Sequence, residues 1–180
     1  EDAGYVVSPG LANTNLKLAA QRDGVEFLFN TEVCKVEHDG GAPYSIVTNA
    51  GQTHQFDVMV NAAGPWSSKI NQLAGVELPL ENRALRREVH AVKNPVFGQH
   101  DMPVVGDLDS GTYFRPETGG IDIVIGSTDP ECDEKEWVEN PDDIDIGLTE
   151  IYWERQVLRT MRRMPEMEMG KARGLAHMYD

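Results

Sequence analysis

Positive charge is scarce in this chain of 180 residues. It has 16 lysines and arginines against 30 aspartates and glutamates, which leaves a formal net charge of -14. Nucleic acids and anionic membranes bind proteins through clustered basic side chains, so this balance argues against both kinds of partner. We interpret the acidic surplus as a source of solubility. No apolar run approaches the ~20 residues that a membrane-spanning helix needs.

Cysteine is equally scarce, since Cys34 and Cys132 are the only two and lie far apart in the sequence. This spacing argues against a disulfide framework or a zinc site, and it favours a reducing, cytoplasmic location. The five histidines are scattered, and we predict no metal site. Several enzyme signatures are also missing: the sequence has no G-x-G-x-x-G, no G-x-x-x-x-G-K-[ST], no H-E-x-x-H and no G-x-S-x-G.

A helix with marked ends opens the first part of the chain. Ser8 can cap its N-terminus, Pro9 suits the first helical position and Gly24 suits its end. Alternating apolar residues predict strands at about 25–37, 44–48 and 52–56. A continuous apolar run at 57–61 predicts a strand buried on both faces, followed by a turn of small residues and a helix from about 67 to 74.

The second part predicts an antiparallel sheet and one long helix. Strands are expected at 86–92, 104–108, 111–115 and 121–126, with turns between them. Residues 129–145 are strongly acidic but lack the spacing of a calcium loop, so we expect a solvated loop. A helix over about 148–164 carries an apolar stripe that we assign to core packing, and residues 170–180 begin another extended piece. The stripe comprises Trp153, Val157, Met161 and Met164.

Together these elements predict an α/β (α+β) fold in two parts. Residues 1–78 form part of a layered sheet, and residues 79–180 form part of a mostly antiparallel sheet with a long helix. The opening strand and helix of a doubly wound domain are missing, and the first and last elements have no evident partner in the sequence. Because the chain also begins without Met, we expect it to be a piece of a longer protein.

One segment that could bind a ligand runs from Asn61 through two alanines and Gly64 to Trp66. Small residues let a ligand approach the backbone closely, and the amides at a helix start favour anions such as a pyrophosphate. The alternative is a tight strand-to-helix turn that needs glycine only for its backbone angles. The residues alone leave both interpretations open.

A second segment places Tyr113 and Arg115 on one face of a strand by two-residue alternation. A phenol beside a guanidinium can clamp a carboxylate. The alternative puts Tyr113 in the core and pairs Arg115 with Glu117 on the surface. These residues do not decide between the two arrangements.

Taken together, the segments resemble the FAD-dependent amine and amino-acid oxidoreductases, the family of sarcosine oxidase, dimethylglycine dehydrogenase and D-amino-acid oxidase. Residues 31–33 are similar to the family's T-x-V, and residues 60–67 to its V-N-A-A-G-x-W-[ST]. Residues 113–129 are similar to the paired strands of the family's substrate domain. The resemblance covers nearly the whole chain, but the family's N-terminal G-x-G-x-x-G and its C-terminal flavin loop are absent.

The resemblance implies that FAD is the cofactor and that residues of the first part help to bind it. These residues are Val33, Ala62, Ala63, Gly64 and Trp66. Because most pyrophosphate contacts would come from the missing N-terminal part, this piece alone is expected to bind FAD weakly or not at all, and to be inactive.

The resemblance also implies that the parent enzyme oxidises a small-molecule amine or amino acid, such as sarcosine or dimethylglycine. A hydride passes from the carbon next to nitrogen to the flavin, and the resulting imine hydrolyses. Tyr113 and Arg115 would face the substrate, and no catalytic residue is assigned. The alternatives are oxidation of a 2-hydroxy acid or glycerol phosphate, and a non-catalytic interaction module. The oligomeric state is not predicted.

Overall fold

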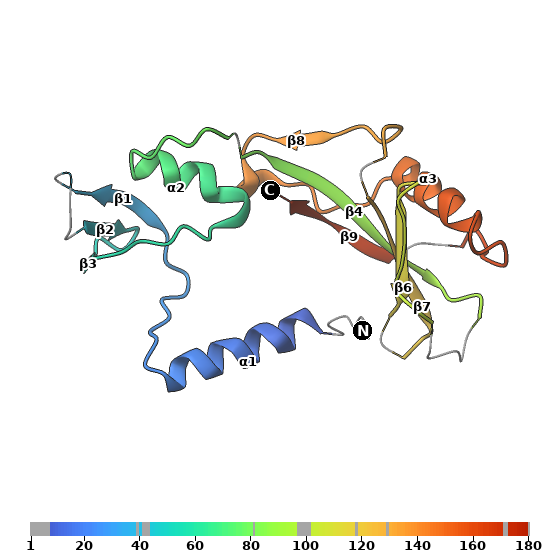
Figure 1. The fold of residues 1–180 in the computed structure, drawn as a ribbon, viewed down its shortest axis with the longest axis horizontal. Coiled ribbons are helices and arrows are strands. Elements are labelled where there is room, and N and C mark those ends of the chain that lie inside the picture. The colour runs from blue at the N-terminus through green and yellow to red at the C-terminus, as the bar shows by residue number, and fades with distance from the viewer. Residues whose placement is uncertain are drawn as a thin grey trace. The chain divides into compact units, whose positions relative to one another are not determined.

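A computed structural model describes residues 8–38, 40, 44–80, 82–96, 102–117, 119–128, 130–170 and 173–179. The described chain divides into two compact units, residues 8–83 and residues 84–179, and each is considered by itself (Figure 1). Both units combine helices with antiparallel sheets, which confirms the predicted fold class. Their roles as a cofactor domain and a substrate domain stay predictions.

The first unit opens with helix α1 (Pro9–Arg22), whose ends are those that the sequence predicts. The Ser8 hydroxyl accepts a hydrogen bond from the Leu11 amide at 3.3 Å, and Gly24 follows the helix with a φ of +87°. No residue of the helix is buried. Its leucines Leu11, Leu16 and Leu18 therefore remain uncovered within the described chain, with Leu16 69% exposed.

Three short strands form an antiparallel meander in the order β1 (Val33–Glu37), β2 (Tyr44–Thr48) and β3 (Thr53–Phe56). The strand predicted over 25–37 is wrong in its first half, because Asn30 adopts a left-handed φ of +54° that interrupts an extended run. Strand β1 begins after this break. Gly40, Gly41 and Pro43 predict a turn between these strands, and of residues 40–43 only Gly40 lies within the described residues.

The buried strand predicted at 57–61 is also wrong. This segment is extended but carries no ladder, and Val58 and Val60 are 77% and 81% exposed. A strand buried on both faces needs neighbouring strands, and the described meander provides none beyond β3. The 3₁₀ turn η1 (Gly64–Trp66) and helix α2 (Ser67–Leu73) follow, close to the predicted helix at 67–74, and Gly75 follows the helix with a φ of +64°.

The second unit contains a six-stranded antiparallel sheet in the order β5-β6-β7-β4-β8, with β9 also paired to β4. The strand bounds are β4 (Ala84–Lys93), β5 (Val105–Asp107), β6 (Thr112–Pro116), β7 (Asp122–Ser127), β8 (Glu136–Val138) and β9 (Arg173–Tyr179). The predicted antiparallel arrangement is confirmed. The prediction that the last element lacks a partner is wrong, because β9 runs beside β4 with seven residue pairs in register (Figure 1).

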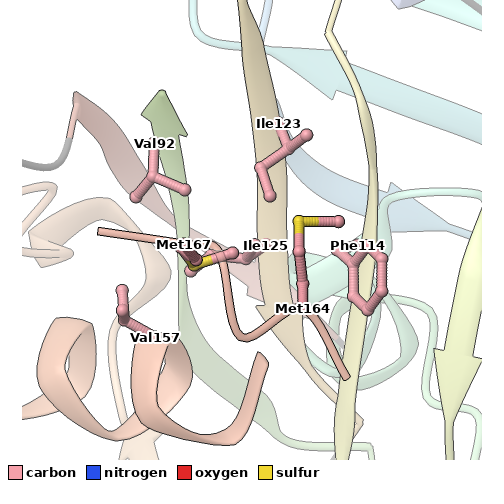
Figure 2. Close-up of a cluster of buried hydrophobic side chains, with 7 residues drawn as sticks. All are labelled: Val92, Phe114, Ile123, Ile125, Val157, Met164 and Met167. Carbon is pink, nitrogen blue, oxygen red and sulfur yellow. The ribbon is translucent and has the colours of Figure 1, made fainter. Parts of the chain in front are cut away.

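Helix α3 (Glu150–Met161) and the segment after it pack on one face of this sheet (Figure 2). The buried cluster joins side chains of β4, β6 and β7 to the helix side. Its members are Val92, Phe114, Ile123, Ile125, Val157, Met164 and Met167. Trp153 and Met161 pack against the cluster, which confirms the predicted core role of the apolar stripe.

The acidic stretch at 129–145 contains regular structure, which corrects the loop prediction, but its described acidic side chains are exposed as predicted, except that of Asp133. It contains β8, which pairs with β4, and the 3₁₀ turn η2 (Pro141–Asp143). Asp133 is only 4% exposed because Arg159 pairs with it. Asp129 itself lies outside the described residues.

No helix among the described residues is long and apolar enough to cross a membrane. Cys34 and Cys132 are both free and exposed. The cytoplasmic location stays a prediction.

Candidate functional site

The bend between residues 61 and 67 is held by the side chain of Asn61. Its Nδ2 donates to the Ser67 carbonyl oxygen at 2.9 Å and to Asn71 Oδ1 at 2.8 Å. Its Oδ1 accepts from the Ala63 amide at 3.2 Å. One side chain therefore ties the incoming chain to α2. This role of Asn61 is not evident from the sequence, although the residue lies inside the V-N-A-A-G segment.

The backbone of this bend is open on one side. Gly64 has a φ of +53°, a conformation that favours glycine, and no atom lies within 4 Å of the place where a Cβ would stand. Ala62 is exposed, while Ala63 and Trp66 are half-buried. Helix α2 has only seven residues and no side-chain cap, so the open peptide groups and not the helix start are the feature that suits a ligand.

Val33 begins the edge strand of the meander. Its backbone pairs with Thr48 on β2, and an irregularity in register follows before Lys35. Among the described strands none pairs with the outer edge of β1. The peptide groups on that edge are therefore available to a flat ligand that hydrogen-bonds to the backbone.

An ion pair connects the start of β1 with the helix after the bend. Lys69 Nζ on α2 lies 2.7 Å from Glu32 Oε1, and Glu32 directly precedes Val33. The first unit thus joins the segment around Val33 to the helix that follows Ala62, Ala63 and Gly64. The pair is half-exposed, so its strength will depend on salt.

A pocket of about 600 Å³ adjoins the bend within the same unit. Asn61 and Asn71 contribute polar groups to its wall, and the stacked rings of Tyr44 and Phe56 contribute an aromatic surface with centroids 5.8 Å apart. Of residues 61–67 only Asn61 lines this pocket, so the pocket lies beside the start of the bend and not over Ala62, Ala63 and Gly64.

Tyr113 and Arg115 share one face of β6, as the alternation predicts. Their neighbours Thr112, Phe114 and Pro116 are buried towards α3, whereas these two side chains are half-buried on the opposite face. Arg115 Nη1 donates to the Pro116 carbonyl oxygen at 3.1 Å. Tyr113 does not belong to the hydrophobic cluster.

Behind this face, β4 carries a buried polar network that the sequence reasoning missed. Arg86 donates to Glu88 and Glu136 at 2.9 and 2.8 Å, and His90 Nδ1 lies 2.7 Å from Gln156 Oε1 on α3. Burial opposes the charge of Arg86, but the hydrogen bonds to the two glutamates outweigh it and raise the pKa of the guanidinium. The alternation of polar residues at 86, 88 and 90 is typical of an exposed face, so it hid this network.

The residues predicted to serve one site fall into two groups. Val33, Ala62, Ala63, Gly64 and Trp66 belong to the first unit, and Tyr113 and Arg115 belong to the second. Within the part of the chain that the structure describes, no group of three or more His, Cys, Asp or Glu side chains could hold a metal ion.

Comparisons with known proteins agree with the resemblance. The sarcosine dehydrogenase (mitochondrial) of Mus musculus is 26% identical over 169 residues, which are 90% of this chain and 18% of that protein. The 4-methylaminobutanoate oxidase (formaldehyde-forming) of Paenarthrobacter nicotinovorans is 29% identical over 131 residues, 72% of this chain and 15% of that protein. The chain therefore spans less than a fifth of either relative.

A solved structure shares the fold. The L-proline dehydrogenase of P. horikoshii superposes with a TM-score of 0.73 at 18% identity, over 93% of this chain and 42% of that one. The model of the FAD dependent oxidoreductase family matches residues 1–169, which cover the first unit and all of the second except its last residues. This chain therefore belongs to the FAD dependent oxidoreductase family, whose cofactor is FAD.

Proposed function

We propose that this chain is the interior of an enzyme that oxidises a secondary or tertiary amine, or an amino acid, at the carbon next to nitrogen. The observation that carries the proposal is the family match, which runs through both the open bend and the strand of Tyr113 and Arg115. The first unit would contribute to the cofactor site and the second to the substrate site. Because the chain spans only part of its relatives, the activity belongs to the complete protein.

The residues of the first unit fit part of an FAD site. The open peptide groups at Ala62, Ala63 and Gly64 leave room for a ligand to lie against the backbone, and Trp66 borders them. The edge of β1 at Val33 can hydrogen-bond with a nucleobase through peptide groups. When bound, FAD would supply the hydride acceptor for the reaction.

The second unit supports a substrate that carries a carboxylate. Sarcosine and 4-methylaminobutanoate, after which two relatives are named, each contain a secondary amine and a carboxylate. The Arg115 guanidinium can bind a carboxylate with charge-assisted hydrogen bonds. Tyr113, on the same face, would pack against the amine end of the molecule.

Substrate turnover by the complete protein tests the reaction class. We expect flavin absorption bands and turnover of an N-methylated amino acid such as sarcosine. Turnover of a 2-hydroxy acid or of glycerol phosphate, without amine oxidation, would favour the first alternative. A complete protein without flavin would favour the non-catalytic interaction module.

Replacement of Arg115 by alanine tests the carboxylate clamp. A charge-assisted hydrogen bond contributes about 1.5–3 kcal/mol, so we expect KM for sarcosine to rise roughly 10- to 100-fold. KM for an amine without a carboxylate should stay unchanged. Arg162→Ala is the matched control, because Arg162 is exposed at the end of α3. An unchanged KM for sarcosine in Arg115→Ala would remove Arg115 from this role.

A further inference from the structure

Two glycines flank Tyr113 in the sheet of the second unit. The backbone of Tyr113 on β6 pairs with Gly106 on β5 and with Gly126 on β7. Directly opposed residues of antiparallel strands share a face, so both glycines lie on the same face as the tyrosine side chain. The ring could occupy the space above either of them.

The ring of Tyr113 lies over Gly126 and not over Gly106. A Cβ built on Gly126 would stand 2.3 Å from both Cζ and Oη of Tyr113 and 2.5 Å from Cε1, whereas a Cβ on Gly106 would meet nothing within 4 Å. A point almost equally far from these three atoms lies out of the plane of the ring, beside its hydroxyl-bearing end. That end of the ring therefore turns one face towards β7, and Gly126 is buried beneath it.

This arrangement leaves the other face of the ring directed away from the sheet. Tyr113 is half-buried, and α3 covers only the opposite side of β6, where Phe114 joins the hydrophobic cluster. The face of a phenol ring attracts a cation through its π electrons. The orientation of the ring thus decides whether that surface is presented beside Arg115, two residues further along the strand.

We propose that Gly126 is a positioning residue, which leaves room for the hydroxyl-bearing end of the Tyr113 ring to lie against β7 so that the outer face of the ring receives the ammonium group of the substrate. The proposal rests on the function proposed above and adds a division of labour. Tyr113 recognises the amine end of the molecule and Arg115 the carboxylate end. Any side chain at position 126 would occupy the place of the ring tip and turn the ring away from the strand.

Gly126→Ala and Gly106→Ala form a matched pair that tests the proposal in the complete, flavin-loaded protein. We expect Gly126→Ala to raise KM roughly 3- to 30-fold, equally for sarcosine and for an amine without a carboxylate. Gly106→Ala should leave both values unchanged. A fluorinated tyrosine incorporated at position 113 should show a shifted ¹⁹F resonance in Gly126→Ala but not in Gly106→Ala.

The Tyr113→Ala background provides the second control. Without the ring, an alanine at position 126 has room, so Gly126→Ala should add no further rise in KM and any loss of folding should be restored. The proposal is overturned if the ¹⁹F resonance of Gly126→Ala matches that of Gly106→Ala, or if the resonance shifts while KM stays constant. An unchanged KM in Tyr113→Ala would also overturn the proposal, because the ring would then not recognise the amine. Failure of the proposed function shows separately, as a parent protein that oxidises no amine.

Discussion

Arg159 and Asp133 meet as a two-pronged ion pair between α3 and the acidic stretch. Nη1 donates to Oδ1 and Nη2 to Oδ2, both at 2.7 Å, and Ser127 Oγ donates to Oδ2 at the same distance. The two residues are only 7% and 4% exposed. This pair fixes the chain between β7 and β8 against the helix that covers the sheet.

Removal of one partner should destabilise the second unit strongly. Asp133→Ala leaves the guanidinium buried without its counter-charge, so we expect the free energy of unfolding of the complete protein to fall by about 3–5 kcal/mol. Urea unfolding followed by tryptophan fluorescence measures this. Arg162→Ala, an exposed arginine of the same helix end, should cost less than about 0.5 kcal/mol. Equal losses in the two variants would contradict the structural role of the pair.

The start of α3 offers a second, smaller test. The Thr149 hydroxyl accepts from the Tyr152 amide at 3.4 Å, while the Thr149 amide donates to both oxygens of Glu88 at 3.1 and 2.9 Å. Thr149→Ala removes only the cap and should cost about 1 kcal/mol. Glu88→Ala should lower the free energy of unfolding by more, because it also removes the buried carboxylate to which Arg86 donates a hydrogen bond. Urea unfolding should therefore show a lower midpoint for Glu88→Ala than for Thr149→Ala, and the reverse order would refute the prediction.

Local signals predicted the elements that depend on local causes. Ser8 and Gly24 mark the ends of α1, and two-residue alternation places Tyr113 and Arg115 on one face of β6. These features depend on neighbours within a few residues, which a single sequence displays.

The failures concern partners that are distant in sequence. The run at 57–61 reads as a buried strand, but burial needs a neighbouring strand, and none is present among the described residues. Asp133 is buried through Arg159, 26 residues away. The role of Asn61 likewise depends on where the fold places Ser67 and Asn71, so its residue type alone could not reveal these hydrogen bonds.

The pH dependence of stability should reflect Asp107 on β5. Its carboxylate accepts from Arg163 Nε at 2.6 Å and from Ser110 Oγ at 2.7 Å. The hydrogen bond from Arg163 and that from Ser110 hold the pKa of Asp107 far below its usual range. A depressed carboxyl pKa stabilises the fold above the unfolded value, near 4, and this contribution is lost as the pH falls through the folded value.

Arg163→Gln tests that assignment. We expect its melting temperature to lie below that of the parent protein from pH 5 to 7, and the gap to narrow as the pH falls below 4. Because Arg163 is half-exposed, added salt should narrow the gap as well. Thermal melts at several pH values measure this, and a gap that widens towards acid would show the opposite sign.

The hydrogen bonds of the Asn61 side chain lead to the sharpest test of the cofactor site. In Asn61→Asp, an oxygen replaces Nδ2 and faces two acceptors, the Ser67 carbonyl oxygen and Asn71 Oδ1. Two hydrogen bonds are lost and the new carboxylate oxygen repels the two acceptor oxygens, so the bend should open and FAD affinity should fall roughly 10- to 100-fold.

Asn71→Asp is the matched control, because it adds a negative charge next to the same site but keeps an acceptor for Asn61 Nδ2. Titration of the complete apoprotein with FAD, followed by flavin fluorescence, compares the two. Equal affinity in both variants would mean that the geometry of the bend does not govern FAD binding, whereas a loss confined to Asn61→Asp would tie the cofactor to the peptide groups that this side chain holds in place.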